Sequence, residues 1–534
     1  MLLIQTHTLT FSYPNASDPT VRDISCALYS GDRIGMVGSN GSGKTTLLKL
    51  LAGVLPAEPG GIHRRAGLRI GYLPQEEIEI GFASCREFLF GDDPELLRLF
   101  RALRDGTADT NGTLYAEYAE RGGFDRETRI ETVRDRFRFD GGFLERPPDT
   151  LSGGEKTRLA LLRLLLAEPD ILFLDEPTNH LDTEGIVWLE RFVAEVETAV
   201  VAVSHDRAFL DSFAESIWEL EGGRLTGYGG NFSTYKRTAA DASARRRRNY
   251  EETRQRIKKL EQAAAERRTR AEHNERFKPK RSVKKNGAFC KIDFGQQRLV
   301  RERNLMRGAK ALEQRIGKEK ETLAVRRPVF IVPPNLTLSE SSLKNRIVIR
   351  LEHIAKAYDG KPVLRDLSLA AARGEKIALM GRNGAGKSTL LKIMAGIVPP
   401  DEGTVTVAPQ ARVGYFAQGH DDLDPEKTVL ELVARGDRDT ETRARTLLGS
   451  LQLRGDTAYQ KAGALSAGQK SKVALVALLM GDADLLLLDE PLAHLEIVTR
   501  EAFEQALTAY AGTVVCVTHD RRFAETFATR VLAL

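Results

Sequence analysis

The chain has 534 residues, enough for roughly three or four domains of about 150 residues each, and its 42% apolar and 29% charged residues exclude wholesale disorder. No stretch approaches about 18 consecutive apolar residues, the start lacks the basic and apolar regions of a signal peptide, and the four cysteines form no CxxC pair. These features exclude a membrane span, argue against a zinc site or a disulfide framework, and indicate the cytoplasm.

The first predicted strand, RIGMVG at 33–38, runs into the glycine-rich sequence GSNGSGKT at 38–45. Glycines let consecutive backbone N–H groups surround a phosphate at the start of a helix. The pattern G-x-x-x-x-G-K-[ST] therefore predicts a phosphate loop, in which Lys44 contacts the β- and γ-phosphates of ATP and Thr45 contacts Mg²⁺. Its other expected ATP-binding residues are Gly38, Asn40, Gly41, Gly43 and Thr46.

Three further motifs follow in the same half of the chain. LSGGE at 151–155 puts Ser152, Gly153 and Gly154 at a predicted helix N-terminus, where N–H groups and a hydroxyl can face a phosphate. The apolar strand ILFLD ends in Asp175, a candidate Mg²⁺ ligand, and is followed by Glu176, a candidate general base. Helix capping is the alternative role for this acidic pair. His205 follows the β-rich run TAVVAVSHD and is suited to sense a γ-phosphate.

Residues 241–327 form a basic block, with 28 Lys and Arg against 12 Asp and Glu, so the rest of the chain carries a net charge of −11. Such a block predicts a polyanionic partner, although a solvated coiled-coil face is the alternative. Tyr250, Ile257, Leu260 and Ala264 have heptad-like spacing, as do Leu305, Leu312, Ile316 and Leu323. We expect two antiparallel helices with a basic, non-helical tip near 277–297. The candidate RNA contacts are Arg245, Arg246, Arg247, Arg248, Lys278, Lys280, Arg281, Lys284, Lys285, Phe289, Ile292 and Phe294.

The motifs of the first half recur after the basic block, so the chain is a tandem repeat. The offset is 343 residues for the phosphate loop and 314 for the later motifs, which places 29 extra residues in the first repeat. They fall between Gln75 and Ser152, within a polar, helix-like stretch at 92–124. Both repeats alternate apolar runs with amphipathic helices, which predicts an α/β fold with a parallel sheet. The second set of candidates is Gly381, Asn383, Gly384, Gly386, Lys387, Ser388, Thr389, Ser466, Gly468, Asp489, Glu490 and His519.

LSGGE and its counterpart LSAGQ at 465–469 are absent from most phosphate-loop proteins, and with them the chain resembles the ATP-binding cassette (ABC) family. In that family two nucleotide domains pack head to tail, and the signature of one completes the ATP site of the other. The resemblance implies a monomer with two such sites. Site one joins Lys44, Thr45, Gln75, Asp175, Glu176 and His205 to Ser466 and Gly468, and site two joins Lys387, Ser388, Gln418, Asp489, Glu490 and His519 to Ser152 and Gly154.

Two further assignments rest on the same resemblance. Gln75 and Gln418, in GYLPQ and GYFAQ, match the family's glutamine loop and are expected to contact ATP and Mg²⁺. Tyr13 and Tyr358 fall where an aromatic side chain stacks on adenine, although a core tyrosine would give the same pattern. Ala467 replaces a signature glycine, at the position that Gly153 holds in the first repeat, so we expect two ATP sites with unequal rates.

Tandem cassettes, a basic helical linker and DEPTNHLD at 175–182 resemble the F subfamily (ABC-F). The resemblance implies domains at 1–237 and 347–534, a linker at 238–346, and an ATPase that binds the E site of the 70S ribosome. There the linker would contact 23S rRNA and P-site tRNA, with neither membrane nor DNA as partner. The aromatic tip and DEPL at 489–492 favour a member that protects the ribosome from peptidyl-transferase antibiotics.

Other functions fit part of the pattern. A housekeeping ABC-F factor acting on stalled ribosomes would share the nucleotide-site motifs and the basic linker, and the aromatic tip and DEPL do not decide against it. A transporter's ATPase subunit would explain the two cassettes but would give the basic block no role. A DNA-repair or chromosome-structuring ABC ATPase would typically carry zinc CxxC modules or far longer coiled coils, and neither is present in the sequence.

Overall fold

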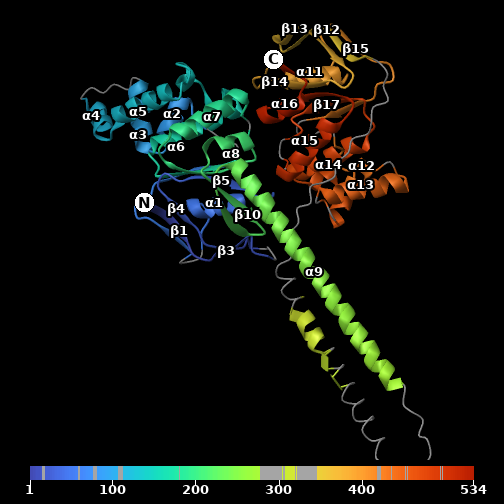
Figure 1. Cartoon of the computed structure of the whole chain (residues 1–534). Coiled ribbons are helices and arrows are strands. Elements are labelled where there is room, and N and C mark those ends of the chain that lie inside the picture. The colour runs from blue at the N-terminus through green and yellow to red at the C-terminus, as the bar shows by residue number, and fades with distance from the viewer. Residues whose placement is uncertain are drawn as a thin grey trace, which may run out of the picture. The chain divides into compact units, whose positions relative to one another are not determined.

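The computed structural model describes most of both repeats and part of the linker (Figure 1). The described residues are 1–14, 18–57, 61–75, 81–105, 112–179, 181–276, 303–304, 307–308, 310–318, 320, 346–417, 423–434, 436–451, 453, 455–492, 495 and 497–534. They belong to two compact units: Met1–Tyr235 with Val332–Leu534, which contains both repeats, and Lys236–Ile331. Several predictions fall outside the described residues, namely Gln418, Leu305, Leu323 and the whole tip at 277–297, as do the side chains of Arg246, Arg247 and Ala467.

The first repeat is built on a six-stranded sheet in the order β11-β10-β5-β9-β8-β7. Neighbouring strands pair in parallel except at the edge, where β11 runs antiparallel to β10. Every residue of β8 and β9 is buried, which explains their uninterrupted apolar runs, because helices cover both faces of such a sheet. The strands are β5(Arg33–Val37), β7(Ile70–Leu73), β8(Ile171–Asp175), β9(Ala199–Val203), β10(Ser216–Glu221) and β11(Arg224–Gly229).

Smaller antiparallel sheets and a helical layer complete the first repeat, and both pack on the large sheet around apolar cores. The small strands are β1(Leu2–Thr6), β2(Leu9–Phe11), β3(Val21–Ile24), β4(Ala27–Tyr29) and β6(Ile62–Arg64). The α-helices are α1(Lys44–Ala52), α2(Cys85–Phe90), α3(Pro94–Arg104), α4(Thr113–Glu120), α5(Gly123–Arg136), α6(Gly153–Leu166), α7(Thr183–Glu195) and α8(Arg207–Phe213), with 3-10 turns at Phe143–Glu145 and Pro148–Thr150.

The second repeat has the same plan, with a five-stranded parallel sheet in the order β16-β17-β18-β14-β19 and an antiparallel sheet in the order β13-β12-β15. This confirms the predicted α/β fold with two tandem domains. The strands are β12(Ile347–Tyr358), β13(Lys361–Ala372), β14(Lys376–Met380), β15(Glu402–Val407), β16(Val413–Phe416), β17(Leu485–Asp489), β18(Thr513–Val517) and β19(Arg530–Ala533). The α-helices are α11(Lys387–Met394), α12(Val429–Val433), α13(Arg438–Ser450), α14(Ala467–Met480), α15(Ile497–Ala509) and α16(Arg521–Phe527), with 3-10 turns at Gly455–Tyr459 and Ala462–Ala464.

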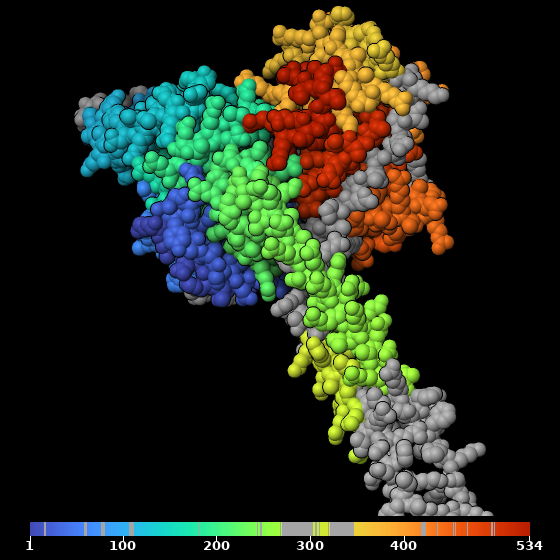
Figure 2. All heavy atoms as spheres, viewed as in Figure 1, coloured from blue at the N-terminus to red at the C-terminus, as the bar shows by residue number. Residues whose placement is uncertain are grey.

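The described part of the extra segment of the first repeat contains α3 and α4, because α2 and α5 have counterparts in α12 and α13 whereas the two helices between them have none among the described residues. The carboxylate of Glu87, on α2, is almost completely buried and binds Arg101 at 2.7 Å and Arg104 at 2.8 Å. Both arginines belong to α3, so these two ion pairs fix the added segment to the body of the repeat. Figure 2 shows the segment, in blue-cyan, at the surface of the first repeat.

The second unit consists of α9(Phe232–Arg276), from Lys236 onward, and a shorter helical segment at 310–318. Its small core contains Ile257, Ala264 and Ile316, with Leu260 and Leu312 packed against them. These are five of the eight predicted seam residues. Lys320 binds Glu261 at 2.7 Å, whereas Gly308 lies beside Arg267, so the two helical segments run antiparallel, as predicted.

Candidate functional site

Each phosphate loop joins a buried parallel strand to a helix, β5 to α1 and β14 to α11. Gly43 and Gly386 are the residues just before these helices and have φ angles of 98° and 92°, in the left-handed region that glycine tolerates best. A Cβ atom on Gly43 would lie 2.9 Å from the carbonyl oxygen of Thr20. The backbone conformation and the lack of space for a Cβ atom therefore both require glycine at position 43. Without a side chain at this position, the backbone N–H groups of the loop can face a ligand.

The loop lysines are buried and fold over their own loops. The ammonium of Lys44 donates to the carbonyl oxygens of Gly38 at 2.9 Å and Ser39 at 3.0 Å. Lys387 makes the equivalent contacts in the second repeat, at 2.8 and 2.7 Å. Burial lowers the pKa of Lys387, and the nearby carboxylates, Glu490 foremost, oppose this effect. Each ammonium thus lies beside backbone N–H groups that can share an anionic ligand.

The two aspartates at the ends of β8 and β17 fit the chemistry of Mg²⁺. The hydroxyl of Thr45 donates to Oδ1 of Asp175 at 3.2 Å. Burial raises the pKa of both Asp175 and Asp489, and hydrogen bonds from Thr45 and Ser388, respectively, oppose the rise. Among the described residues, Oδ2 of Asp175 and Oδ1 of Asp489 are buried without a hydrogen-bond partner. A hydroxyl beside an unsatisfied carboxylate oxygen is the all-oxygen environment that Mg²⁺ prefers.

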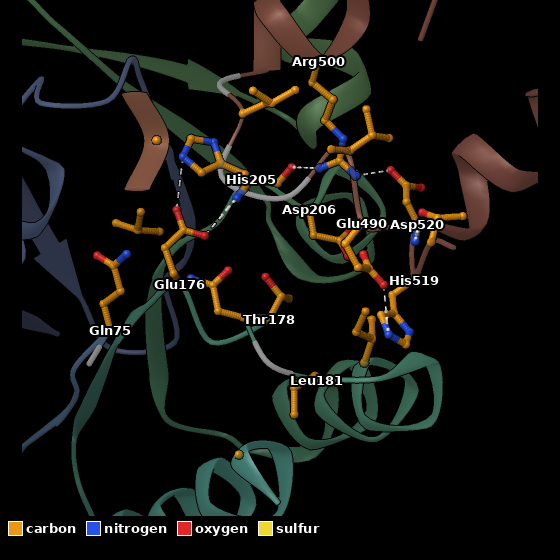
Figure 3. Close-up of a pocket in the computed structure, with 18 of the residues that line it drawn as sticks. Gln75, Glu176, Thr178, Leu181, His205, Asp206, Glu490, Arg500, His519 and Asp520 are labelled. Carbon is orange, nitrogen blue, oxygen red and sulfur yellow. Dashed lines mark hydrogen bonds and ion pairs between the residues drawn. The ribbon is translucent and has the colours of Figure 1, made fainter. Parts of the chain in front are cut away.

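The residue after each aspartate is a glutamate held in an uncommon backbone conformation. Glu176 and Glu490 have φ angles of 49° and 50°, so both occupy the left-handed region at the turn that leaves the strand. The backbone N–H of His205 donates to Oε2 of Glu176 at 3.2 Å, and its ring Nε2 lies 3.3 Å from Oε1. The ring Nε2 of His519 lies 3.1 Å from Oε1 of Glu490 (Figure 3). Each repeat therefore brings together the glutamate and histidine that its sequence motifs predicted.

Burial sets the protonation of these groups. It raises the pKa of Glu176 to about 7, an effect that Lys44 opposes. It also raises the pKa of Glu490 to about 8, and the neighbouring Asp489 adds to that rise. Burial lowers the pKa of His519 to about 4, with a further contribution from Lys387. Carboxyl groups with pKa values near neutrality can accept a proton from water more readily than exposed ones.

One pocket contains most of the predicted residues of both repeats, some of which are shown in Figure 3. Its lining includes Tyr13, Asn40, Gly41, Gly43, Lys44, Thr45, Thr46, Gln75, Ser152, Gly153, Asp175, Glu176 and His205 from the first repeat, and Asn383, Gly384, Gly386, Lys387, Ser388, Thr389, Ser466, Gly468, Asp489, Glu490 and His519 from the second. Of the two candidate adenine-stacking tyrosines, Tyr13 belongs to this lining and Tyr358 does not.

The signature serines begin helices α6 and α14 and cap them. Oγ of Ser152 accepts the N–H of Glu155, whose carboxylate in turn accepts the backbone N–H of Ser152 at 2.9 Å. Ser466 and Gln469 form the same reciprocal cap in the second repeat. Such a capping box holds the helix N-terminus, and therefore its positive end, in the wall of the pocket.

Comparisons with known proteins agree with this site. A family model described as ABC transporter matches residues 21–179 and 364–493, and a second model of the same description matches 218–285. The energy-dependent translational throttle protein EttA of Mycobacterium tuberculosis is 32% identical over 529 residues, which cover 96% of this chain and 88% of that protein. The chain belongs to the ABC-F subfamily. It is therefore an ATP-binding enzyme of the ATP hydrolase class.

Other ABC proteins extend the comparison. EttA of Escherichia coli K12 is 32% identical over 543 residues, covering 96% of this chain and 88% of that protein. The ATP-binding protein YdiF of Bacillus subtilis is 32% identical over 558 residues, covering all of this chain and 80% of that protein. Among solved structures, the RNase-L Inhibitor has a TM-score of 0.58 at 21% identity, with 99% and 87% of the two chains covered, and shares the ABC fold.

Within the described part of the chain, no helix combines the length and the apolar character needed to cross a bilayer.

The pocket also contains residues for which the sequence predicted no role, notably Asp206, Arg500 and Asp520. Arg500 belongs to no recognisable motif, and the corresponding residue of the first repeat is Ile186, so no sequence signal pointed to it.

The two repeats also contact each other around this pocket. The backbone N–H of Asn383, in the second phosphate loop, donates to Asp182 at 3.2 Å. Arg382 of the same loop binds Glu184 at 2.6 Å. The segment after the acidic motif of the first repeat therefore lies against the phosphate loop of the second.

Proposed function

We propose that this chain is a cytoplasmic ABC-F ATPase that binds the ribosome and uses ATP to control translation. The observation that carries the proposal is the 32% identity to the energy-dependent translational throttle protein EttA over 96% of the chain. Because that similarity includes the region between the repeats as well as the nucleotide sites, it supports the function of the whole arrangement. The E site of the 70S ribosome, with 23S rRNA and P-site tRNA, is the proposed place of binding.

At each proposed ATP site, a lysine and the N-terminal N–H groups of α1 or α11 bind the phosphates. Glu176 and Glu490 take a proton from the attacking water, and His205 and His519 position the γ-phosphate. Thr45 with Asp175, and Ser388 with Asp489, would hold Mg²⁺, with Gln75 and Gln418 as the remaining candidates. Bound there, Mg²⁺ supplies positive charge that stabilises the phosphate oxygens during transfer.

The linker is the proposed ribosome-contacting element because its positive charge suits RNA phosphates. Arg245 and Arg248 are suitable positions for testing this charge, because their side chains are described and exposed on α9. Replacing both with Gln should weaken ribosome binding and reduce the slope of log affinity against log salt by about one per charge. Lys361→Gln with Arg373→Gln is the matched control, because it removes two exposed charges from the second repeat. An equal loss of binding in the control would contradict a special role for the linker.

The decisive experiment is ribosome pelleting with the Glu176→Gln, Glu490→Gln double variant, which should retain ATP. We expect this variant to sediment with 70S ribosomes in ATP but much less in ADP, while the parent dissociates as it hydrolyses ATP. Membrane vesicles serve as the competing fraction. Sedimentation with vesicles, or with neither fraction in either nucleotide, would overturn the proposal and would, in the first case, favour a transporter subunit.

Antibiotic protection is the second candidate function, favoured by the uncharged side chains Phe289, Ile292 and Phe294 at the basic tip. Such side chains can stack on rRNA bases or press on neighbouring nucleotides. If the tip acts in this way, changing all three to Ala should abolish protection of a sensitive host while ribosome pelleting and ATPase activity remain. A parent protein that protects against no peptidyl-transferase drug leaves the housekeeping role.

A further inference from the structure

Arg500, on α15, connects the histidine loops of the two repeats (Figure 3). Its Nη1 donates to the backbone carbonyl of His205 at 3.1 Å, and its Nη2 donates to the carboxylate of Asp520. Asp520 directly follows His519, and its other oxygen accepts the N–H of Phe523 at the start of α16. The planar guanidinium of Arg500 therefore connects the loop that carries His205 with the loop that carries His519.

The contact belongs to a buried charge network. Arg500 and Arg207, from opposite repeats, are 9% and 6% exposed, respectively. Arg207 binds Glu504 and lies 3.6 Å from the Asp520 carboxylate that Arg500 also binds. Nε of Arg500 lies 3.4 Å from Glu504. Because both guanidiniums are buried and share carboxylates, displacing either loop would leave a charged group without its partner, which is costly in a protein interior.

The position of Arg500 links it to both glutamates. Arg500 donates to the backbone carbonyl of His205, and the backbone N–H of the same His205 donates to Glu176. A single residue therefore separates the Arg500 hydrogen bond from the Glu176 carboxylate. On the other side, Asp520, which Nη2 of Arg500 binds, directly follows His519, whose ring Nε2 lies 3.1 Å from Oε1 of Glu490. Arg500 is therefore connected through each histidine loop to the glutamate of one proposed ATP site.

Only one of the two repeats provides this connection. One other ion pair of the interface does recur in both repeats: Arg207 with Glu504 corresponds to Arg521 with Glu190 through the same 314-residue offset. Arg500, in contrast, corresponds to Ile186, which also lines the pocket but cannot donate a hydrogen bond.

We propose that Arg500 is a positioning residue that couples ATP hydrolysis at the two sites, by tying the His205 loop of the first repeat to the Asp520 end of the His519 loop. The inference rests on the catalytic roles proposed above for the two glutamates. When one site rearranges its histidine loop, the guanidinium transmits the movement, because its two donor groups are fixed in one plane. With Arg500 removed, each site should work at a rate independent of the other.

The test compares turnover of the parent with that of two single-site variants, Glu490→Gln and Glu176→Gln. Coupled sites are expected to give a parental rate at least about fivefold above the sum of the two single-site rates. In the Arg500→Met background the two single-site rates should add up to the rate of Arg500→Met alone. Arg500→Lys should lose coupling in the same way, because an ammonium keeps the charge but lacks the planar fork.

Arg521→Met is the matched control, because the Arg521 side chain pairs with Glu190 across the same interface. It should leave the coupling intact. Persistent coupling in Arg500→Met, or an equal loss in Arg521→Met, would overturn the proposal, as would additive rates in the parent. The Hill coefficient for ATP gives a readout that does not depend on the glutamates: it should fall to about 1 in Arg500→Met and Arg500→Lys. If the double Glu→Gln protein keeps parental activity, the glutamate roles fail, and the Hill coefficient still decides the role of Arg500.

Discussion

Replacing both proposed general bases, Glu176→Gln with Glu490→Gln, should abolish hydrolysis while preserving ATP binding. The amide has the shape of the carboxyl group, and one oxygen can still accept the His205 N–H that now lies 3.2 Å from Oε2. The left-handed backbone at both positions should therefore remain, and the fold with it. What the variant lacks is an atom that can take a proton from water.

A positioned general base contributes about 10²- to 10⁴-fold to a rate. At about 1.4 kcal/mol for each factor of ten, this corresponds to roughly 3–5 kcal/mol of activation free energy per site. Phosphate release at saturating ATP and Mg²⁺ measures the loss, and equilibrium ATP binding and thermal unfolding check that the site is intact. Glu195→Gln with Glu426→Gln, one exposed carboxylate in each repeat, is the control and should keep the parental rate. A loss of less than tenfold in the double variant would refute the assignment of the base.

Further predictions concern pH, the phosphate loop and the signature. With one base removed, kcat/KM for ATP should rise with pH through about 7 in Glu490→Gln, where Glu176 works, and through about 8 in Glu176→Gln, where Glu490 works. The sign follows because burial raises each pKa and only the deprotonated carboxylate is a base; pH–rate profiles at constant ionic strength check it. Gly43→Ala should cost roughly 1–3 kcal/mol of unfolding free energy and weaken ATP binding, since its φ of 98° and a backbone oxygen 2.9 Å from the new Cβ both oppose a side chain. Denaturant titration should show a smaller loss for Gly41→Ala, whose added Cβ meets no atom within 4 Å. Ala467→Gly should raise single-site turnover in the Glu490→Gln background, and an unchanged rate would show that the methyl group is accommodated.

The sequence by itself determined the repeat, the α/β class and most of the nucleotide site, because each depends on residues close together in the chain. A phosphate loop needs its glycines and its lysine within eight positions, and a buried strand such as β8 or β17 is visible as an apolar run that ends in an acidic pair. The spacing of Ile257, Leu260 and Ala264 likewise shows which face of α9 packs. Local geometry carries these signals, so a single sequence is enough to read them.

Only the tertiary structure decided which residues meet across the repeats. Arg500 and His205 lie 295 positions apart, and their hydrogen bond exists because α15 packs against the histidine loop of the other repeat. No periodic pattern in the sequence predicts such a pairing. Comparison of the repeats does not predict it either, because Ile186 occupies the position in the first repeat that corresponds to Arg500. The physical reason is that these contacts depend on how two folded surfaces meet, and that arrangement is set by packing over the whole interface rather than by the residues within any one motif.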